Sequence, residues 1–116
     1  MQRHGWTLLF HDCLVEQLDR LAAAAGVISE PEPLNANAKL LLALRHAMFE
    51  VVPSNPGADI HRQGNTLGKA HRHWRRIKIG QRFRLFFRYD ARARIIVYAW
   101  VNDNYALSHK MQARPR

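Results

Sequence analysis

The stretch WRRIKIGQRFRLFFRYDARARIIVYAWV, residues 74–101, decides the fold class. Apolar and polar side chains alternate over residues 74–79, 82–89 and 94–101, which is the pattern of half-buried β-strands. Gly80-Gln81 and Asp90-Ala91 separate the three runs and are suited to tight turns. The stretch therefore predicts a three-stranded antiparallel meander.

The same alternation sorts the side chains of the predicted sheet into two faces. One face holds the apolar residues Ile77, Ile79, Phe83, Leu85, Phe87 and Tyr89. The other holds Phe86 and the basic residues Arg76, Lys78, Arg82, Arg84 and Arg88. Like charges placed opposite one another destabilise a sheet, so a sheet that keeps them is expected to bind an anion there. We expect the apolar face to pack on helices and the basic face to be presented.

The segment before the meander predicts a short strand and two helices. Residues 6–11 are rich in aromatic and apolar side chains, as in a strand. Apolar residues then recur with helical spacing over residues 13–25, after Asp12 as the N-cap, and over residues 38–51, after Asn37. The predicted fold class is α+β: an N-terminal short strand and a two-helix hairpin packed on a curved antiparallel β-sheet.

Charge is distributed unevenly along the 116 residues, whose formal net charge is +9. Residues 1–60 carry 4 Lys and Arg against 7 Asp and Glu, whereas residues 61–94 carry 11 Lys and Arg against Asp90. A block this basic indicates a polyanionic partner such as RNA or DNA.

The length suits a single domain over residues 1–116. No apolar run approaches the roughly 20 residues of a membrane span, and no signal-peptide cleavage site follows the N-terminus. Cys13 is the one cysteine of the chain, which suits a reducing compartment. We expect a cytoplasmic protein that does not bind membranes.

The basic face suits the cleavage of RNA, because RNA carries its own nucleophile, the ribose 2′-OH. Arg76 and Arg84 are candidates for stabilising the charge of the transition state, since arginine offers two donors to phosphate oxygens. His71, His73 and Lys78 are candidates for proton transfer, because cationic neighbours lower the pKa of an amine or imidazole. The residues alone leave open a non-catalytic surface that only binds nucleic acid.

Further residues of the basic block are candidates for binding nucleic acid: Lys69, His71, His73, Trp74, Arg82 and Arg88. Aromatic side chains near them can stack on bases, although Trp100 is expected in the core. The seven histidines lack the spacing of a zinc site and no CxxC motif is present, so we expect neither a metal nor another cofactor.

Seven short motifs, in order along the chain, resemble the YhaV family of toxins. They are GW at 5–6, KLL at 39–41, PSNP at 53–56, QGNTLG at 63–68, HWRRIKIG at 73–80, RFRLFFRYD at 82–90 and WVND at 100–103. The motifs from residue 73 onward are the most specific. After Asp103 the chain does not follow the usual continuation of the family, so we expect an atypical or truncated C-terminus.

The resemblance implies a RelE-like fold and a ribonuclease that cuts mRNA, free or on the ribosome. It also implies inhibition by a PrlF-type, AbrB-like antitoxin, and repression of their own promoter by the two proteins bound to DNA. By the motif positions, Arg76, Lys78 and Arg84 match the phosphate-binding and catalytic bases of RelE-like toxins.

Overall fold

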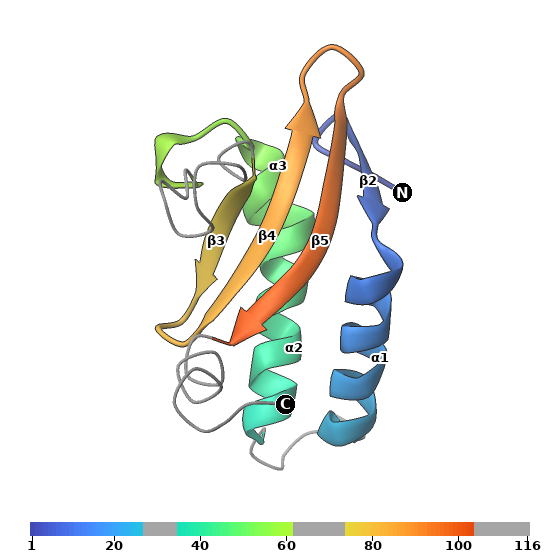
Figure 1. The fold of residues 1–116 in the computed structure, drawn as a ribbon, viewed down its shortest axis with the longest axis vertical. Coiled ribbons are helices and arrows are strands. Elements are labelled where there is room, and N and C mark those ends of the chain that lie inside the picture. Colours follow the sequence, from blue (N-terminus) through green and yellow to red (C-terminus); the bar gives the residue numbers. More distant parts are fainter. Residues whose placement is uncertain (27–34, 62–73, 104–116) are drawn as a thin grey trace, which may run out of the picture.

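The structure is a computed structural model that describes residues 1–26, 35–61 and 74–103 (Figure 1). Its elements, in chain order, are β1 (Gln2–Arg3), β2 (Trp6–Phe10), α1 (Asp12–Ala25), α2 (Ala36–His46), the π-helical turn η1 (Ala47–Val51), α3 (Val52–Ser54), the 3-10 turn η2 (Asp59–His61), β3 (Arg75–Ile79), β4 (Phe83–Asp90) and β5 (Ile95–Asp103). Within these residues the strands form one five-stranded sheet in the order β1-β2-β5-β4-β3.

The sheet contains the predicted meander, because β3, β4 and β5 pair antiparallel in sequence order. The N-terminal strand β2 also joins the sheet and lies parallel to β5, with Thr7 opposite Ile95. Strand β1 pairs antiparallel with β2 through a two-residue turn at His4 and Gly5, both with positive φ. The predicted α+β class is confirmed, but the sheet is mixed rather than antiparallel throughout.

Both predicted helices are present, each with an N-cap other than the predicted one. In α1 the cap is His11, whose Nδ1 accepts from the amide of Cys13 at 3.0 Å. In α2 the cap is Asn35, whose Oδ1 accepts from the amide of Ala38 at 2.7 Å. Asn35 also donates to the carbonyl of Ala25 at 3.1 Å, which joins the beginning of α2 to the end of α1. Asn37 lies within α2, so it is not the N-cap.

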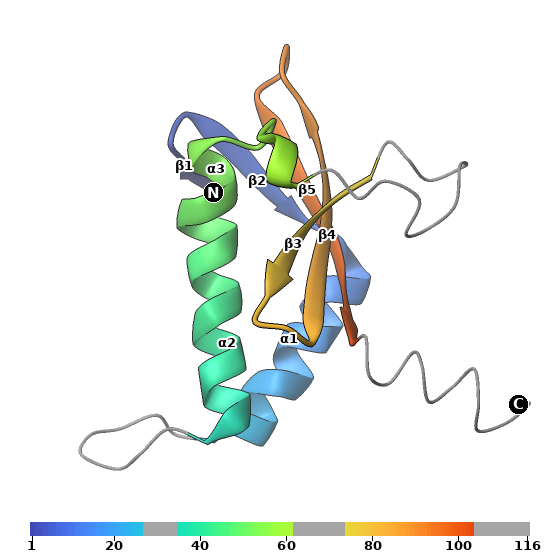
Figure 2. The same ribbon diagram turned by 90° about the vertical axis from the view of Figure 1, so that its left-hand side faces the viewer.

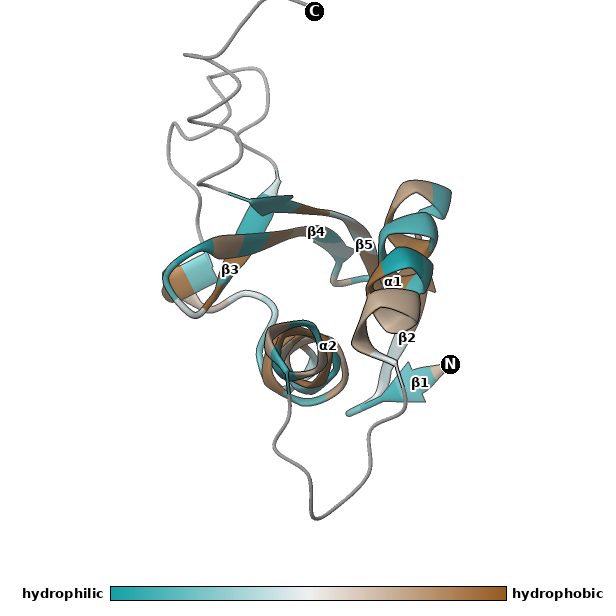
Figure 3. Ribbon diagram, turned by 90° about the horizontal axis from the view of Figure 1, so that it is seen from below, coloured by the Kyte–Doolittle hydropathy of each residue, from teal (hydrophilic) through white to brown (hydrophobic). Residues whose placement is uncertain are grey.

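The core lies between the helices and one face of the sheet. Figures 1 and 2 show α2 running along that face, and Figure 3 shows the strands curving around α2 with α1 beside β5. The core cluster consists of Trp6, Leu8, Leu14, Leu44, Ala47, Met48, Val52, Ile79, Leu85, Phe87, Ile96 and Tyr98. No helix in residues 1–26, 35–61 and 74–103 is long and apolar enough to cross a membrane.

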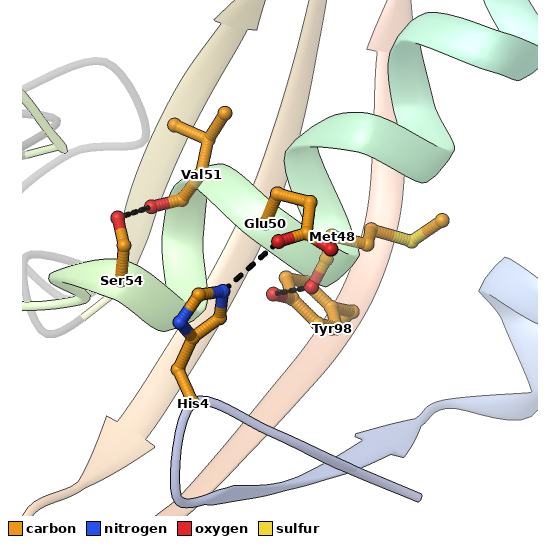
Figure 4. Close-up of polar contacts among 6 residues, drawn as sticks. All are labelled: His4, Met48, Glu50, Val51, Ser54 and Tyr98. Atoms are coloured by element: carbon orange, nitrogen blue, oxygen red, sulfur yellow. Dashed lines mark hydrogen bonds and ion pairs between the residues drawn. The ribbon is translucent and has the colours of Figure 1, made fainter.

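The π-helical turn at the end of α2 is held to the sheet by side chains (Figure 4). The hydroxyl of Tyr98 donates to the carbonyl of Met48 at 2.7 Å, and His4 lies 3.0 Å from a carboxylate oxygen of Glu50. Burial raises the pKa of Tyr98, so the phenol remains a neutral donor. These contacts connect β5 and the β1–β2 turn to the segment that leads into η2.

Substitution of Tyr98 by phenylalanine is expected to lower the free energy of unfolding by about 1–3 kcal/mol, because the buried carbonyl of Met48 would lose its donor. Tyr89→Phe, at a partly exposed tyrosine, is the matched control and is expected to change stability by less than about 0.5 kcal/mol. Urea denaturation followed by circular dichroism measures both. Equal effects of the two substitutions would contradict the importance of this contact.

Candidate functional site

A cluster of basic side chains lies on the face of the sheet that points away from α2. We call this cluster, which consists of Arg76, Lys78, Arg84 and Arg88, the basic face. The predicted sorting of side chains is confirmed for these four residues, because Ile79, Leu85 and Phe87 are buried in the core and the basic residues alternate with them. Across the strands, Lys78 lies opposite Arg84 and Arg76 lies opposite Phe86.

Arg76 is the most confined of these cations. Its side chain is partly buried, and its Nε has no hydrogen-bond partner within the described residues. Burial, and to a lesser extent the charge of Arg84, lowers the pKa of Arg76. A guanidinium stays protonated despite such a shift, so the cation sits in an electropositive and poorly hydrated place. A bound anion would reduce the repulsion between Arg76 and Arg84, and it would accept a hydrogen bond from Nε of Arg76.

An aromatic cluster borders the basic face. Phe86 is fully buried and stacks on Trp100, with ring centroids 4.7 Å apart. Trp100 meets the edge of Trp74 at 5.4 Å, and the guanidinium of Arg88 lies 5.1 Å from the Trp74 ring centre. Flat rings next to cations suit the bases and phosphates of single-stranded RNA.

The prediction that Trp100 belongs to the core is wrong. The register places Trp100 opposite Phe86 but Tyr98 opposite Phe87, so Ala99 is an extra residue in β5. This β-bulge reverses the alternation, and Trp100 faces outward while Tyr98 and Ile96 stay in the core.

The structure does not bring Arg82 to the basic face. Arg82 precedes β4 in the turn, where strand alternation does not apply. Its Nε and Nη2 each donate to a carboxylate oxygen of Asp103 at 2.8 Å. Of the other predicted binding residues, Lys69, His71 and His73 lie outside the described residues, so their positions stay predictions.

A cavity of about 460 Å³ lies beside β3, between η1, η2 and the basic face. Its lining residues are Val51, Ile60, His61, Arg76, Ile77 and Lys78. His61 was not singled out from the sequence, because it follows a proline- and glycine-containing loop without periodicity. Its side chain is only 4% exposed, its ring meets the edge of Phe87 at 5.4 Å, and its Nδ1 has no hydrogen-bond partner within the described residues.

A second hollow, of about 290 Å³, lies at the aromatic end of the basic face. It is lined by His11, Cys13, Trp74, Ala99 and Trp100. Within the part of the chain that the structure describes, no three His, Cys, Asp or Glu side chains are grouped so that they could hold a metal ion.

The sequence matches the family Toxin_YhaV, described as a toxin with endonuclease activity of a toxin–antitoxin system, over residues 8–114. This match includes most of residues 104–116, where the quoted motifs do not continue and which lie outside the described residues. The ribonuclease toxin YhaV of Escherichia coli K12 is 34% identical over 110 residues, which cover 90% of this chain and 71% of the relative. The toxin YhaV of Escherichia coli O157:H7 matches with the same values.

Solved structures with similar folds are RelE-like toxins. The toxin–antitoxin complex RelBE2 of Mycobacterium tuberculosis matches with a TM-score of 0.57 and 18% identity, covering 85% of this chain and 98% of that chain. A mutant of the Escherichia coli toxin RelE in the free state matches with a TM-score of 0.58 and 14% identity, covering 94% of each chain. The predicted RelE-like fold is confirmed.

Proposed function

Because the chain belongs to the YhaV family of toxins with endonuclease activity in toxin–antitoxin systems, we propose that it is a metal-independent endoribonuclease that cuts mRNA. The observation that carries this proposal is the basic face, where Arg76 and Lys78 of β3 lie beside Arg84 of β4. Lys78 is directly opposite Arg84, and Arg76 is opposite Phe86, two residues further along β4. Cleavage proceeds by attack of the ribose 2′-OH on the neighbouring phosphorus, which yields a 2′,3′-cyclic phosphate and a 5′-hydroxyl.

In this proposal Arg76 and Arg84 bind the non-bridging phosphate oxygens and stabilise the charge that grows on them in the transition state. Lys78 lies opposite Arg84 and supplies a proton to the leaving 5′-oxygen. Arg88 and the ring of Trp74 hold the adjoining nucleotide by charge and stacking. Lys69, His71 and His73 remain predicted RNA contacts.

The proposal extends to the setting in which the enzyme works. We infer a single RelE-like domain over residues 1–116 in the cytoplasm, acting on mRNA that is free or on the ribosome. A PrlF-type, AbrB-like antitoxin binds and inhibits it, and the two proteins together bind their promoter DNA. The support is the family membership and the fold shared with the toxin of a solved toxin–antitoxin complex.

Purified protein is expected to cut mRNA in excess EDTA, since the proposed chemistry uses side chains and the 2′-OH only. The measurement is incubation with mRNA, with and without ribosomes, followed by mapping of the ends. A single 2′-deoxy substitution at the mapped position is expected to abolish cleavage there, because it removes the nucleophile. Salt-dependent binding without cleavage would instead identify a non-catalytic module that binds nucleic acid or antitoxin.

A further inference from the structure

We propose that His61 is the general base of this site and removes the proton from the attacking ribose 2′-OH. The role rests on the proposed ribonuclease function. Arg76, Lys78 and Arg84 are cations, so they do not account for removal of the proton from the 2′-OH. His61 belongs to η2, whereas the three cations come from β3 and β4. The cavity beside β3 is lined by residues of η1, η2 and β3, and Arg84 of β4 lies opposite Lys78.

Two of the residues that line the cavity each have a buried polar atom without a hydrogen-bond partner within the described residues. These atoms are Nδ1 of His61 and Nε of Arg76. Unmet buried groups of this kind destabilise a fold, which favours a ligand that pairs with them. The Arg76 atom is a donor, so it suits an oxygen of a phosphate. A ribose 2′-OH lies next to its own 3′-phosphate and offers a donor and acceptors in adjacent positions.

The role requires the neutral tautomer of His61 that carries its lone pair on Nδ1. Nδ1 is buried and has no hydrogen-bond partner within the described residues, so it is able to accept one. In this proposal the neutral ring carries its proton on Nε2, and Nδ1 takes the proton of the 2′-OH.

The surroundings of His61 keep the ring neutral. Burial, followed by the charge of Arg75, lowers the pKa of His61, against the raising effect of the Pro56 backbone. The charged groups near it are Arg75, Arg76 and Lys78 from β3 and Asp59 from its own turn, while Phe87 of β4 and Val51 of η1 add no charge. A neutral imidazole at pH 7 is in the form that a general base requires.

His61 and Lys78 together account for both proton transfers of the cleavage reaction. The 2′-OH gives its proton to Nδ1 of His61 as its oxygen forms a bond to phosphorus. The bond from phosphorus to the 5′-oxygen breaks, and the leaving oxygen takes a proton from Nζ of Lys78. The two side chains return to their initial states by exchanging protons with water. Because neighbouring atoms cover Nδ1 in the free protein, we expect the exposed side chain of Lys78 to turn toward the phosphate as RNA enters.

The test compares RNA cleavage by the wild-type protein with that by His61→Phe and His61→Asn. Phenylalanine keeps the ring contact with Phe87 and removes both nitrogens, whereas asparagine keeps hydrogen bonding without basicity. Both are expected to lower kcat by roughly 10²–10⁴-fold with a change in KM below about threefold. In the wild type, kcat/KM is expected to fall on the acid side below pH 6.5, and this limb is expected to disappear from the residual activity of both variants.

His46→Gln, at an exposed histidine of α2, is the matched control and is expected to leave cleavage unchanged. Thermal melts show whether each variant is folded, and His61→Asn keeps the comparison usable where His61→Phe does not fold. If the wild type is active and the variants are equally active, or if the variants retain the acid limb, His61 is not the general base. This result would leave the ribonuclease function standing. An inactive, folded wild type would overturn the ribonuclease function and this inference together.

Discussion

Replacement of Arg76 by alanine is expected to slow RNA cleavage by at least roughly 10²–10³-fold and to abolish growth arrest on induction. Arg76 is the cation with the unmet Nε donor, and it lies beside the cavity and next to the charge of Arg84. A donor placed in a poorly hydrated position before the substrate arrives stabilises a transition state more than a mobile surface cation does. Single-turnover cleavage of a labelled RNA measures the effect.

Arg45→Ala is the control for the loss of one positive charge. Arg45 is exposed in the last turn of α2, in the helical layer rather than on the basic face. We expect this variant to cleave at the wild-type rate within about twofold, and both variants to keep the wild-type circular dichroism spectrum. Unchanged toxicity of a folded Arg76→Ala protein would place the active centre elsewhere on the molecule.

The Phe86→Ala substitution is expected to lower the free energy of unfolding by about 3–5 kcal/mol. Phe86 is fully buried although it lies on the side of the basic face, where it stacks on Trp100 and pairs with Arg76 of β3. The substitution leaves a cavity under the basic face and removes the ring contact. Because small domains are stable by only about 5–15 kcal/mol, urea denaturation should show a large shift of the midpoint.

Leu9→Ala is the matched control, because Leu9 of β2 is 47% exposed and its loss opens no cavity in the core. Its expected effect on the free energy of unfolding is below about 1 kcal/mol. A similarly small effect of Phe86→Ala would mean that the aromatic cluster contributes little to the fold and is available to rearrange around bases.

The sequence predicted the parts of the fold that follow from local periodicity. The alternation around Ile79 and Leu85 identified the meander and the side of the sheet that carries Arg76, because neighbouring strands in a meander pair in a fixed order. The two helices followed from their apolar spacing. The predicted N-cap of the second helix was wrong because Asn35 also bonds to the end of α1, which is a tertiary contact.

Features that depend on distant contacts could not be predicted in this way. The parallel pairing of β2 with β5 has no local signature, and the extra residue Ala99 reverses the face of Trp100 without changing the apolar pattern of β5. His61 joins the site only because η2 packs against β3 and β4, and nothing in its sequence neighbourhood distinguishes it.

The parallel pairing of β2 and β5 also affects when the protein can fold. Thr7 is synthesised before its partner Ile95, so β5 must emerge from the ribosome before it can pair with β2 and complete the sheet. Contacts between residues so far apart in sequence slow folding, because a long loop must close first. Until then β4 lacks its neighbour on one side, and Arg84 is not held opposite Asn102. The order of the strands therefore delays completion of the sheet that carries the basic face until β5 has been synthesised.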